Sequence, residues 1–247
     1  MKKVVLLALC VMIAAVTLTG CIAVYTPGVW GRGITGRGAM ETYTIEVGEF
    51  TEVRVELLCD ILYSSEPSDS VTLEIQPNLM KHIIVEESGG VLKVRSTRSI
   101  RWTTNAQTPV LHISTPELNR VTHAGAGSFR TIDPIVADAF TLSITGAADS
   151  KAVLDVDSLT VKLTGAGDIE LSGRADVADV GIAGAGKLDA LGLKTRSTAI
   201  NLAGVGTVRI SCEESLSIVA GGVGTVEYSG TPVIDISRGG LVTLRSV

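Results

Sequence analysis

Residues 163–188 read LTGAGDIELSGRADVADVGIAGAGKL and contain two Gly-Ala-Gly motifs, which begin at Gly165 and Gly184. The same motif thus returns after a short interval. Apolar residues alternate with polar ones on both sides of each motif, which is the pattern of half-buried β-strands. The stretch therefore predicts a strand, a glycine bend, a second strand and a turn.

The same unit recurs along the C-terminal half of the chain. The predicted bend glycines are Gly125, Gly127, Gly146, Gly165, Gly167, Gly184, Gly186, Gly204, Gly206, Gly222 and Gly224, and Gly239–Gly240 forms a worn further copy. The first glycines of successive copies are separated by a nearly constant interval of about 20 residues, and self-similarity at such a period is the signature of a solenoid.

The length of the repeat decides the type of solenoid. About 20 residues at ~3.3 Å each are too few for a strand, a returning helix and two connections, but they suffice for one small β-coil. We therefore predict an all-β fold in which residues 121–247 form a right-handed, parallel β-helix-like solenoid. Residues 41–120 contain strands of unequal length, and they are expected to form an irregular β-rich part of the same domain. A helical turn is expected only near 78–83.

The glycines have two possible roles. They can allow close packing at a bend that stacks coil upon coil, or they can cradle a phosphate. The phosphate-binding fingerprint requires a helix after the glycines. Strands follow them here and the motif recurs, so the structural role is favoured.

The amino-acid composition limits the type of core and the classes of function that can be expected. Apolar residues make up 45% of the chain and aromatic residues only 4%, so the core must be largely aliphatic. The net charge is −5 and no run of Lys or Arg is present. Nucleic-acid binding is therefore not expected, because neutralisation of phosphates supplies most of its affinity.

The N-terminus reads as an export signal. Lys2 and Lys3 precede an apolar stretch at 4–16, which is short for a membrane span and typical of a signal peptide. The following Leu18-Thr-Gly-Cys21 resembles the lipobox of bacterial lipoproteins, which implies cleavage after residue 20 and lipidation of Cys21. Residues 21–40 are glycine-rich and are expected to tether the domain to a membrane. The membrane, through Cys21, is thus an expected partner.

Two further cysteines, Cys59 and Cys212, belong to the expected domain. An oxidising envelope would permit a disulfide. Their large separation and different contexts favour two separate buried thiols.

An ordered set of motifs resembles the auto-transporter adhesin head GIN domain family. Residues 215–232 are similar to its closing motif, Pro116-Glu-Leu118 before Gly125-Ala-Gly127 resembles the entry to its first bend, and Gly48-Glu-Phe50 is similar to its start. The resemblance covers roughly 45–240 and departs from the pattern at Ala148 and at 238–240. It implies a β-helix-like fold, a cell-envelope location and an adhesive role, with no catalytic residues.

No catalytic constellation can be argued from spacing. His82, His112 and His123 lack the spacing of a metal pair, and His123 is expected to be an ordinary surface residue. The residues that follow the bends are expected to stack in a ladder: Ser128, Asp149, Asp168, Lys187, Thr207 and Thr225. Asp149 and Asp168 could hold a weakly bound cation, but a solvated rim is the favoured interpretation.

These observations predict a non-enzymatic, lipid-anchored envelope protein that needs no cofactor. Its partner would be a polysaccharide, another envelope component or a host surface. Two alternatives remain open: an enzyme that acts on polysaccharide in a β-helix groove, and an envelope scaffold or signalling accessory.

Overall fold

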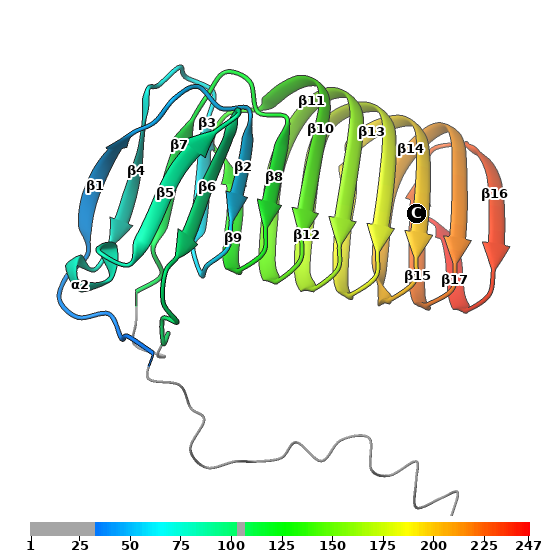
Figure 1. The fold of residues 1–247 in the computed structure, drawn as a ribbon. Helices are drawn as coiled ribbons and strands as arrows, with labels where there is room; N and C mark the ends of the chain where they lie inside the picture. The colour runs from blue at the N-terminus through cyan, green and yellow to red at the C-terminus, as the bar shows by residue number, and fades with distance from the viewer. Residues whose placement is uncertain (1–32, 103–106) are drawn as a thin grey trace, which may run out of the picture. The chain divides into compact units, whose positions relative to one another are not determined.

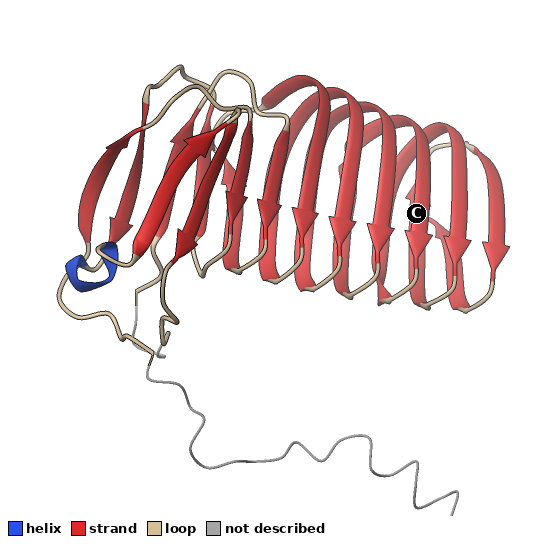
Figure 2. Cartoon of the chain, in the orientation of Figure 1, coloured by secondary structure: helices blue, strands red, loops and turns tan. Residues whose placement is uncertain are grey.

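The computed structural model describes residues 33–102 and 107–247. The expected signal peptide (1–20), the lipidation site Cys21 and most of the expected tether (21–40) lie outside the described residues. The described chain is almost entirely β-structure and stacks in regular coils, which confirms the predicted fold class (Figure 2).

Long parallel strands form the regular coils (Figure 1). They are β10 (Ile135–Ile144), β11 (Ala147–Leu163), β12 (Ala166–Ile182), β13 (Ala185–Leu202) and β14 (Val205–Ala220), followed by β15 (Val223–Ser229), β16 (Val233–Arg238) and β17 (Leu241–Ser246). Ala147 of β11 pairs with Ala166 of β12, which in turn pairs with Ala185 of β13. Each coil therefore stacks on the coil that precedes it in the chain.

Every coil has two faces and two edges. Face A comprises the strand segments that run into the glycine bends, and face B comprises the segments that leave them. The glycine edge contains the bends themselves, and the opposite edge joins face B to the next face A. The sequence predicted a turn at the opposite edge. Instead, β11 to β14 continue through it as single strands of 16 to 18 residues, because parallel pairing persists through most of the bend.

The N-terminal part also contains coils of the stack. β2 (Glu52–Val55) and β3 (Asp60–Ser64) form one coil, and β6 (Val91–Ser96) and β7 (Val110–Ser114) form another. The first regular coil begins with β8 (Arg120–His123) and β9 (Ala126–Thr131). Strand β2 pairs with β6 on one side and β8 on the other, and β3 likewise lies between β7 and β9. A coil from early in the chain is thus inserted between two later ones.

Antiparallel strands close the N-terminal end of the stack. These are β1 (Glu41–Glu46), β4 (Ser70–Ile75) and β5 (Ile83–Ser88), with the one-turn helix α2 (Pro77–Met80) before β5. Strand β5 pairs with β6 on face A, while β4 pairs with β7 and β1 with β4 on face B. The helix lies where the sequence predicted a helical turn.

The last residues of the expected tether are fixed to this cap. Ile34 forms a parallel bridge with Ile100. The side-chain amide of Asn78 donates to the carbonyl of Thr35 at 2.9 Å, and its oxygen accepts the N–H of Arg37 at 2.8 Å. The described chain therefore begins at the glycine edge, beside the connection that follows β6.

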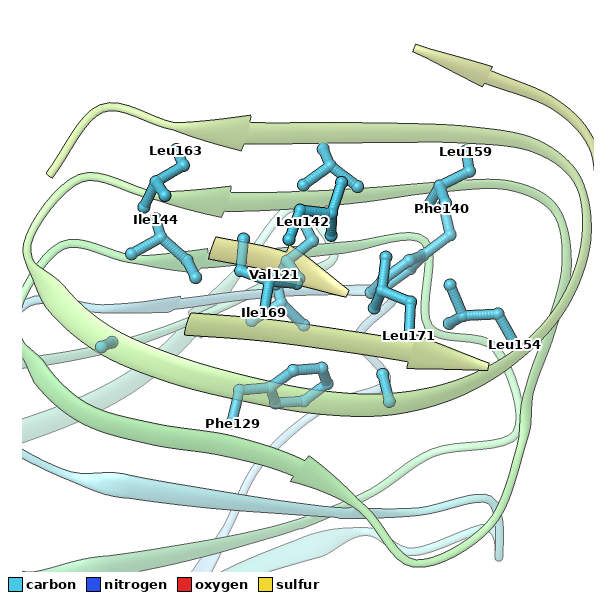
Figure 3. Close-up of a cluster of buried hydrophobic side chains, with 14 of the residues drawn as sticks. Val121, Phe129, Phe140, Leu142, Ile144, Leu154, Leu159, Leu163, Ile169 and Leu171 are labelled. Carbon is cyan, nitrogen blue, oxygen red and sulfur yellow. The ribbon is translucent and has the colours of Figure 1, made fainter. Parts of the chain in front are cut away.

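The core is a column of inward-pointing side chains (Figure 3). Strand β11 alternates exposed and buried residues along most of its length, so each coil supplies aliphatic rungs such as Leu154, Leu163 and Ile169. Phe129 of β9 and Phe140 of β10 are buried in the same column. Burying one such side chain contributes about 1.5–3 kcal/mol. In the described residues, no helix is long and apolar enough to cross a membrane.

Candidate functional site

The glycine edge brings backbone directly onto backbone. A β-carbon added to Gly146 would lie 1.7 Å from the carbonyl oxygen of Gly125, and one added to Gly165 would lie equally close to that of Gly146. The same approach recurs at the later bends. The amide of Ala166 donates to the carbonyl of Gly146 at 2.9 Å, and each following coil repeats this bond. No residue with a side chain fits these first-glycine positions without displacing the neighbouring coil.

The second glycine of a bend serves a related purpose. Gly127 and Gly167 have φ angles of +119° and +154°, and a β-carbon at either would collide with a carbonyl of the preceding coil. At the Gly146 bend, Ala148 takes this position and points into the core. The bends thus have a steric explanation, and none of them precedes a helix that would bind phosphate.

Carboxylates next to the bends satisfy backbone amides. The Oδ1 atom of Asp149 accepts the N–H of Asp168 at 2.9 Å, and that of Asp168 accepts the N–H of Lys187 at 3.2 Å. Nearer the cap, the hydroxyl of Ser128 donates to Asp60. Coil stacking therefore brings Asp149 and Asp168 together, and one oxygen of each is occupied by a structural hydrogen bond.

These residues form one wall of a shallow groove on the outer side of face B, with a volume of about 410 Å³. One row of side chains is Ser128, Asp149, Asp168 and Lys187. The second row is Arg130, Lys151, Glu170 and Asp189. The strand backbone between the rows forms the floor. The groove therefore presents donors and acceptors in two straight rows, repeated once per coil.

Ion pairs order the second row. Lys151 lies 2.8 Å from Glu170, and Arg209 bridges Asp189 at 2.7 Å and Glu227 at 3.1 Å. Partial burial opposes ionisation of Asp189, but hydrogen bonds from Lys187 and Arg209 outweigh it and lower the pKa of its carboxyl. The Asp189 carboxylate therefore stays charged at neutral pH, held by its two basic neighbours.

The histidines do not converge. His112 lies on the outer side of β7, 3.0 Å from Glu74, and His82 is half-buried before β5. The expectation that His123 lies on the surface is wrong: its side chain is fully buried, stacked between Val55 and Ile144. In β8 every second side chain points inward, and His123 follows this alternation from Val121. The sequence pattern of β8 could therefore have predicted that His123 is buried. Burial lowers the pKa of its imidazole.

The two cysteines are separate and buried, and neither forms a disulfide. The prediction of two buried thiols is therefore confirmed. Burial, with the nearby Asp60 carboxylate, raises the pKa of the Cys59 thiol to about 12. A thiol with so high a pKa does not act as a nucleophile near neutral pH. Across residues 33–102 and 107–247, no three His, Cys, Asp or Glu side chains are grouped to hold a metal ion.

The structure also contains a second hollow, which the sequence did not predict. It measures about 880 Å³ and lies at the opposite edge of the cap, between the connections 47–51, 67–69 and 115–117. Glu49, Asp69 and Glu117 line it, and no basic residue does. The acidic residues of these connections were visible in the sequence, but their convergence depends on the interleaved pairing of strands.

Short coils of nearly constant length, closed by stacked glycines and carrying ordered polar rows outside, define a β-solenoid protein. The chain belongs to the family described as "Putative auto-transporter adhesin, head GIN domain", which matches residues 49–232. The resemblance inferred from the sequence is therefore confirmed.

Several solved structures share the fold. A putative adhesin from Bacteroides fragilis is 24% identical, with a TM-score of 0.81, and the match covers 87% of this chain and all of that one. A putative lipid binding protein from Parabacteroides distasonis is 23% identical with a TM-score of 0.67, again over 87% and 100% of the two chains. A putative adhesin from Parabacteroides merdae is 19% identical with a TM-score of 0.62, over 87% and 99%. No curated protein matches the sequence.

Proposed function

We propose that this protein is a lipid-anchored, non-enzymatic binding module of the bacterial cell envelope, and that the face B groove holds an extended, polar polymer such as a polysaccharide. The observation that carries the proposal is the pair of straight polar rows along the groove. A ligand with regularly repeated hydroxyl groups can donate to the carboxylates of one coil and accept from the lysines of the next. The family description, which names an adhesin, supports a binding role.

The chemistry of the groove favours binding over turnover. Its carboxylates are engaged either with backbone amides or with basic side chains. General acid–base catalysis needs a group whose pKa lies near the working pH, and the perturbed carboxyl in the groove, that of Asp189, has its pKa lowered. An adhesive role needs only ordered, exposed hydrogen-bonding groups.

A matched pair of variants tests the groove. Lys151 lies on face B and Lys162 on face A of the same strand, β11, and both are exposed. Lys151→Ala is expected to weaken binding to an immobilised neutral polysaccharide about tenfold, since a hydrogen bond to a charged group is worth roughly 1.5–3 kcal/mol. Lys162→Ala is expected to bind like the wild type. Equal affinities for the two variants would place the ligand elsewhere.

Turnover is measured on the same polysaccharides and on peptidoglycan. The proposal expects retained, unshortened polymer after prolonged incubation. Suppose instead that the wild type releases shortened chains and that a groove variant with an unchanged circular dichroism spectrum does not. That result would establish the enzyme alternative.

The anchor rests on Leu18-Thr-Gly-Cys21 and on the apolar stretch before it. Cys21→Ser is expected to leave the protein unlipidated, so that it no longer partitions into the detergent phase as the wild type does. A variant that still partitions with detergent would contradict lipidation at Cys21.

A further inference from the structure

Exposed apolar side chains occur at both edges, for example Ile132 and Val233 at the opposite edge, but at the C-terminal part of the glycine edge they stack on consecutive coils. Val205, Val223 and Leu241 are 60%, 49% and 77% exposed, and they pair with one another on consecutive coils. Val219, which is 52% exposed, lies just before the bend at 221–224. Large apolar groups at exposed bends cost solvation free energy unless something covers them.

Charge is absent from this whole row of bends. The bends are 124–127, 145–148, 164–167, 183–186, 203–206, 221–224 and 239–242, and none contains a charged residue. Exposed bends are normally polar. The stacking of glycines explains the glycine positions, but it places no restriction on the exposed side chain between them.

The two edges differ in the sign of their charge where the cap is built. The described connections at the glycine edge carry Arg37, Lys81, Arg98 and Arg101. Their one acidic residue, Glu56, is paired with Arg54 at 2.6 Å. The connections between strands at the opposite edge of the described chain instead carry Glu49, Glu66, Asp69, Glu117 and Asp133, with no basic residue.

The described chain also starts at the glycine edge, where Ile34 bridges to Ile100. Residues 22–33 separate this point from Cys21, and a segment of that length spans at most about 40 Å when fully extended. A lipid on Cys21 would therefore keep the glycine edge within reach of the bilayer.

From these observations we infer that the glycine edge lies against the surface of an anionic lipid bilayer. The inference rests on the proposed lipid anchor and adds the orientation of the domain. Apolar side chains of the later bends enter the headgroup boundary, and the basic cap residues face anionic lipids. The acidic edge points away from the membrane, and the groove on face B stays open to solvent.

The test uses the lipidated full-length protein, inserted into preformed vesicles of phosphatidylcholine and phosphatidylglycerol, and a charged maleimide that does not cross membranes. Cys59 and Cys212 are buried, so the wild type has no reactive thiol if Cys21 is acylated. Two matched pairs of cysteine variants compare the edges. Val223→Cys (49% exposed) is paired with Val177→Cys (51%), and Val205→Cys (60%) with Val136→Cys (63%).

On vesicles, Val223→Cys and Val205→Cys are expected to react roughly tenfold more slowly than their partners, since a contact populated about nine-tenths of the time leaves one-tenth of the reactivity. In detergent, the members of each pair react alike. Equal rates on vesicles, with an unreactive wild type, would overturn the orientation alone. Reaction of the wild type at Cys21 would contradict the lipid anchor, and the orientation would fall with it. Protection that persists in detergent would assign the edge to a second copy of the chain and overturn the lipid contact.

Discussion

The two edges of each coil obey different rules. At the glycine edge, residues stay in register without a break from Ala126 to Leu241. At the opposite edge, the register shifts between Glu170 and Ser172, where β13 carries one additional residue, and again between 190 and 197. Every irregularity among β11–β14 lies on one side of the solenoid. Variation in coil length is therefore absorbed at the opposite edge, where close backbone approaches are made by single glycines, Gly173 and Gly230, rather than by every coil.

This difference explains how one fold can keep its coils aligned while its sequence varies. The glycine edge fixes the spacing of the coils through contacts that leave no room for a β-carbon. The opposite edge accommodates charged side chains and extra residues because alternate side chains along it point into solvent. The following predictions test this division of roles.

The largest effect is expected at a central bend. Gly165→Val places a side chain against the carbonyl of Gly146, so the free energy of unfolding should fall by about 3 kcal/mol, the upper end of the usual cost of overpacking. For a domain of this size that loss lowers the melting temperature by about 6 °C or more. Gly239→Val is the control, because the nearest atom to its added β-carbon is 3.9 Å away, and Gly240 holds the stacked position instead. Variants that melt together would contradict the steric role of the glycines.

An inserted residue should be tolerated at one edge only. An alanine inserted between Leu171 and Ser172 gives β12 the length that β13 already has, so a bulge like the one already present there should accommodate it with little loss of stability. The same insertion between Gly165 and Ala166 breaks the hydrogen bond from Ala166 to Gly146 and should cost clearly more. Thermal unfolding of the two insertions compares the edges directly, and equal losses would show that both are equally constrained.

Acidification should destabilise the start of the glycine edge. His123 is fully buried and its ring nitrogens have no hydrogen-bond partner among the described residues. Burial lowers the pKa of His123 below its ordinary value of 6.5, although the backbone near Ala126 and Leu57 and the Asp60 carboxylate oppose the shift. The unfolded chain then binds more protons than the folded one as the pH falls below 6.5. The contribution of neutral, buried His123 to stability is therefore complete above that pH and is lost progressively below it.

His123→Leu removes this titration and keeps an apolar rung between Val55 and Ile144. Denaturant unfolding at about pH 7.5 and pH 5.5 should therefore show a smaller loss of stability in the variant than in the wild type. If both proteins lose the same stability, other groups dominate the acid response.

The smallest loss of stability is expected when an ion pair on the outer side of face B is removed. Arg209 bridges Asp189 and Glu227 at the surface, and exposed ion pairs of this kind contribute about 0.2–1 kcal/mol. Arg209→Ala should thus change the melting temperature by no more than a few degrees, and added salt should reduce the difference further. A loss comparable to that of Gly165→Val would mean that the outer rows, not the bends, hold the coils together.

The regular coils were predictable because their information is local. The spacing of Gly165 and Gly184 reports the coil length, and alternation around Leu163 and Ile169 reports which side chains face inward. The interleaved cap was not predictable, because β2 and β3 pair with β8 and β9, which follow them only after four intervening strands and a helix. No pattern within either segment indicates that partner.

The candidate site was predictable only in part. The ladder that contains Asp149 and Asp168 follows from the repeat, but the hydrogen bonds that each carboxylate accepts from the next coil depend on the geometry of the glycine bends. Likewise, the charge difference between the edges appears only once the connections of the cap are placed on one edge or the other.

Hydrogen exchange at the bends tests the central claim, that the coils are locked through backbone contacts at the glycine edge. The amides of Ala166 and Ala185 lie at an exposed corner, yet they donate to Gly146 and Gly165 at 2.9 and 3.0 Å. We predict that they exchange as slowly as the amide of Val161 inside β11, since both open only when neighbouring coils separate. Exchange as fast as that of the amides of the exposed residues Glu66 and Ser68 would contradict the account.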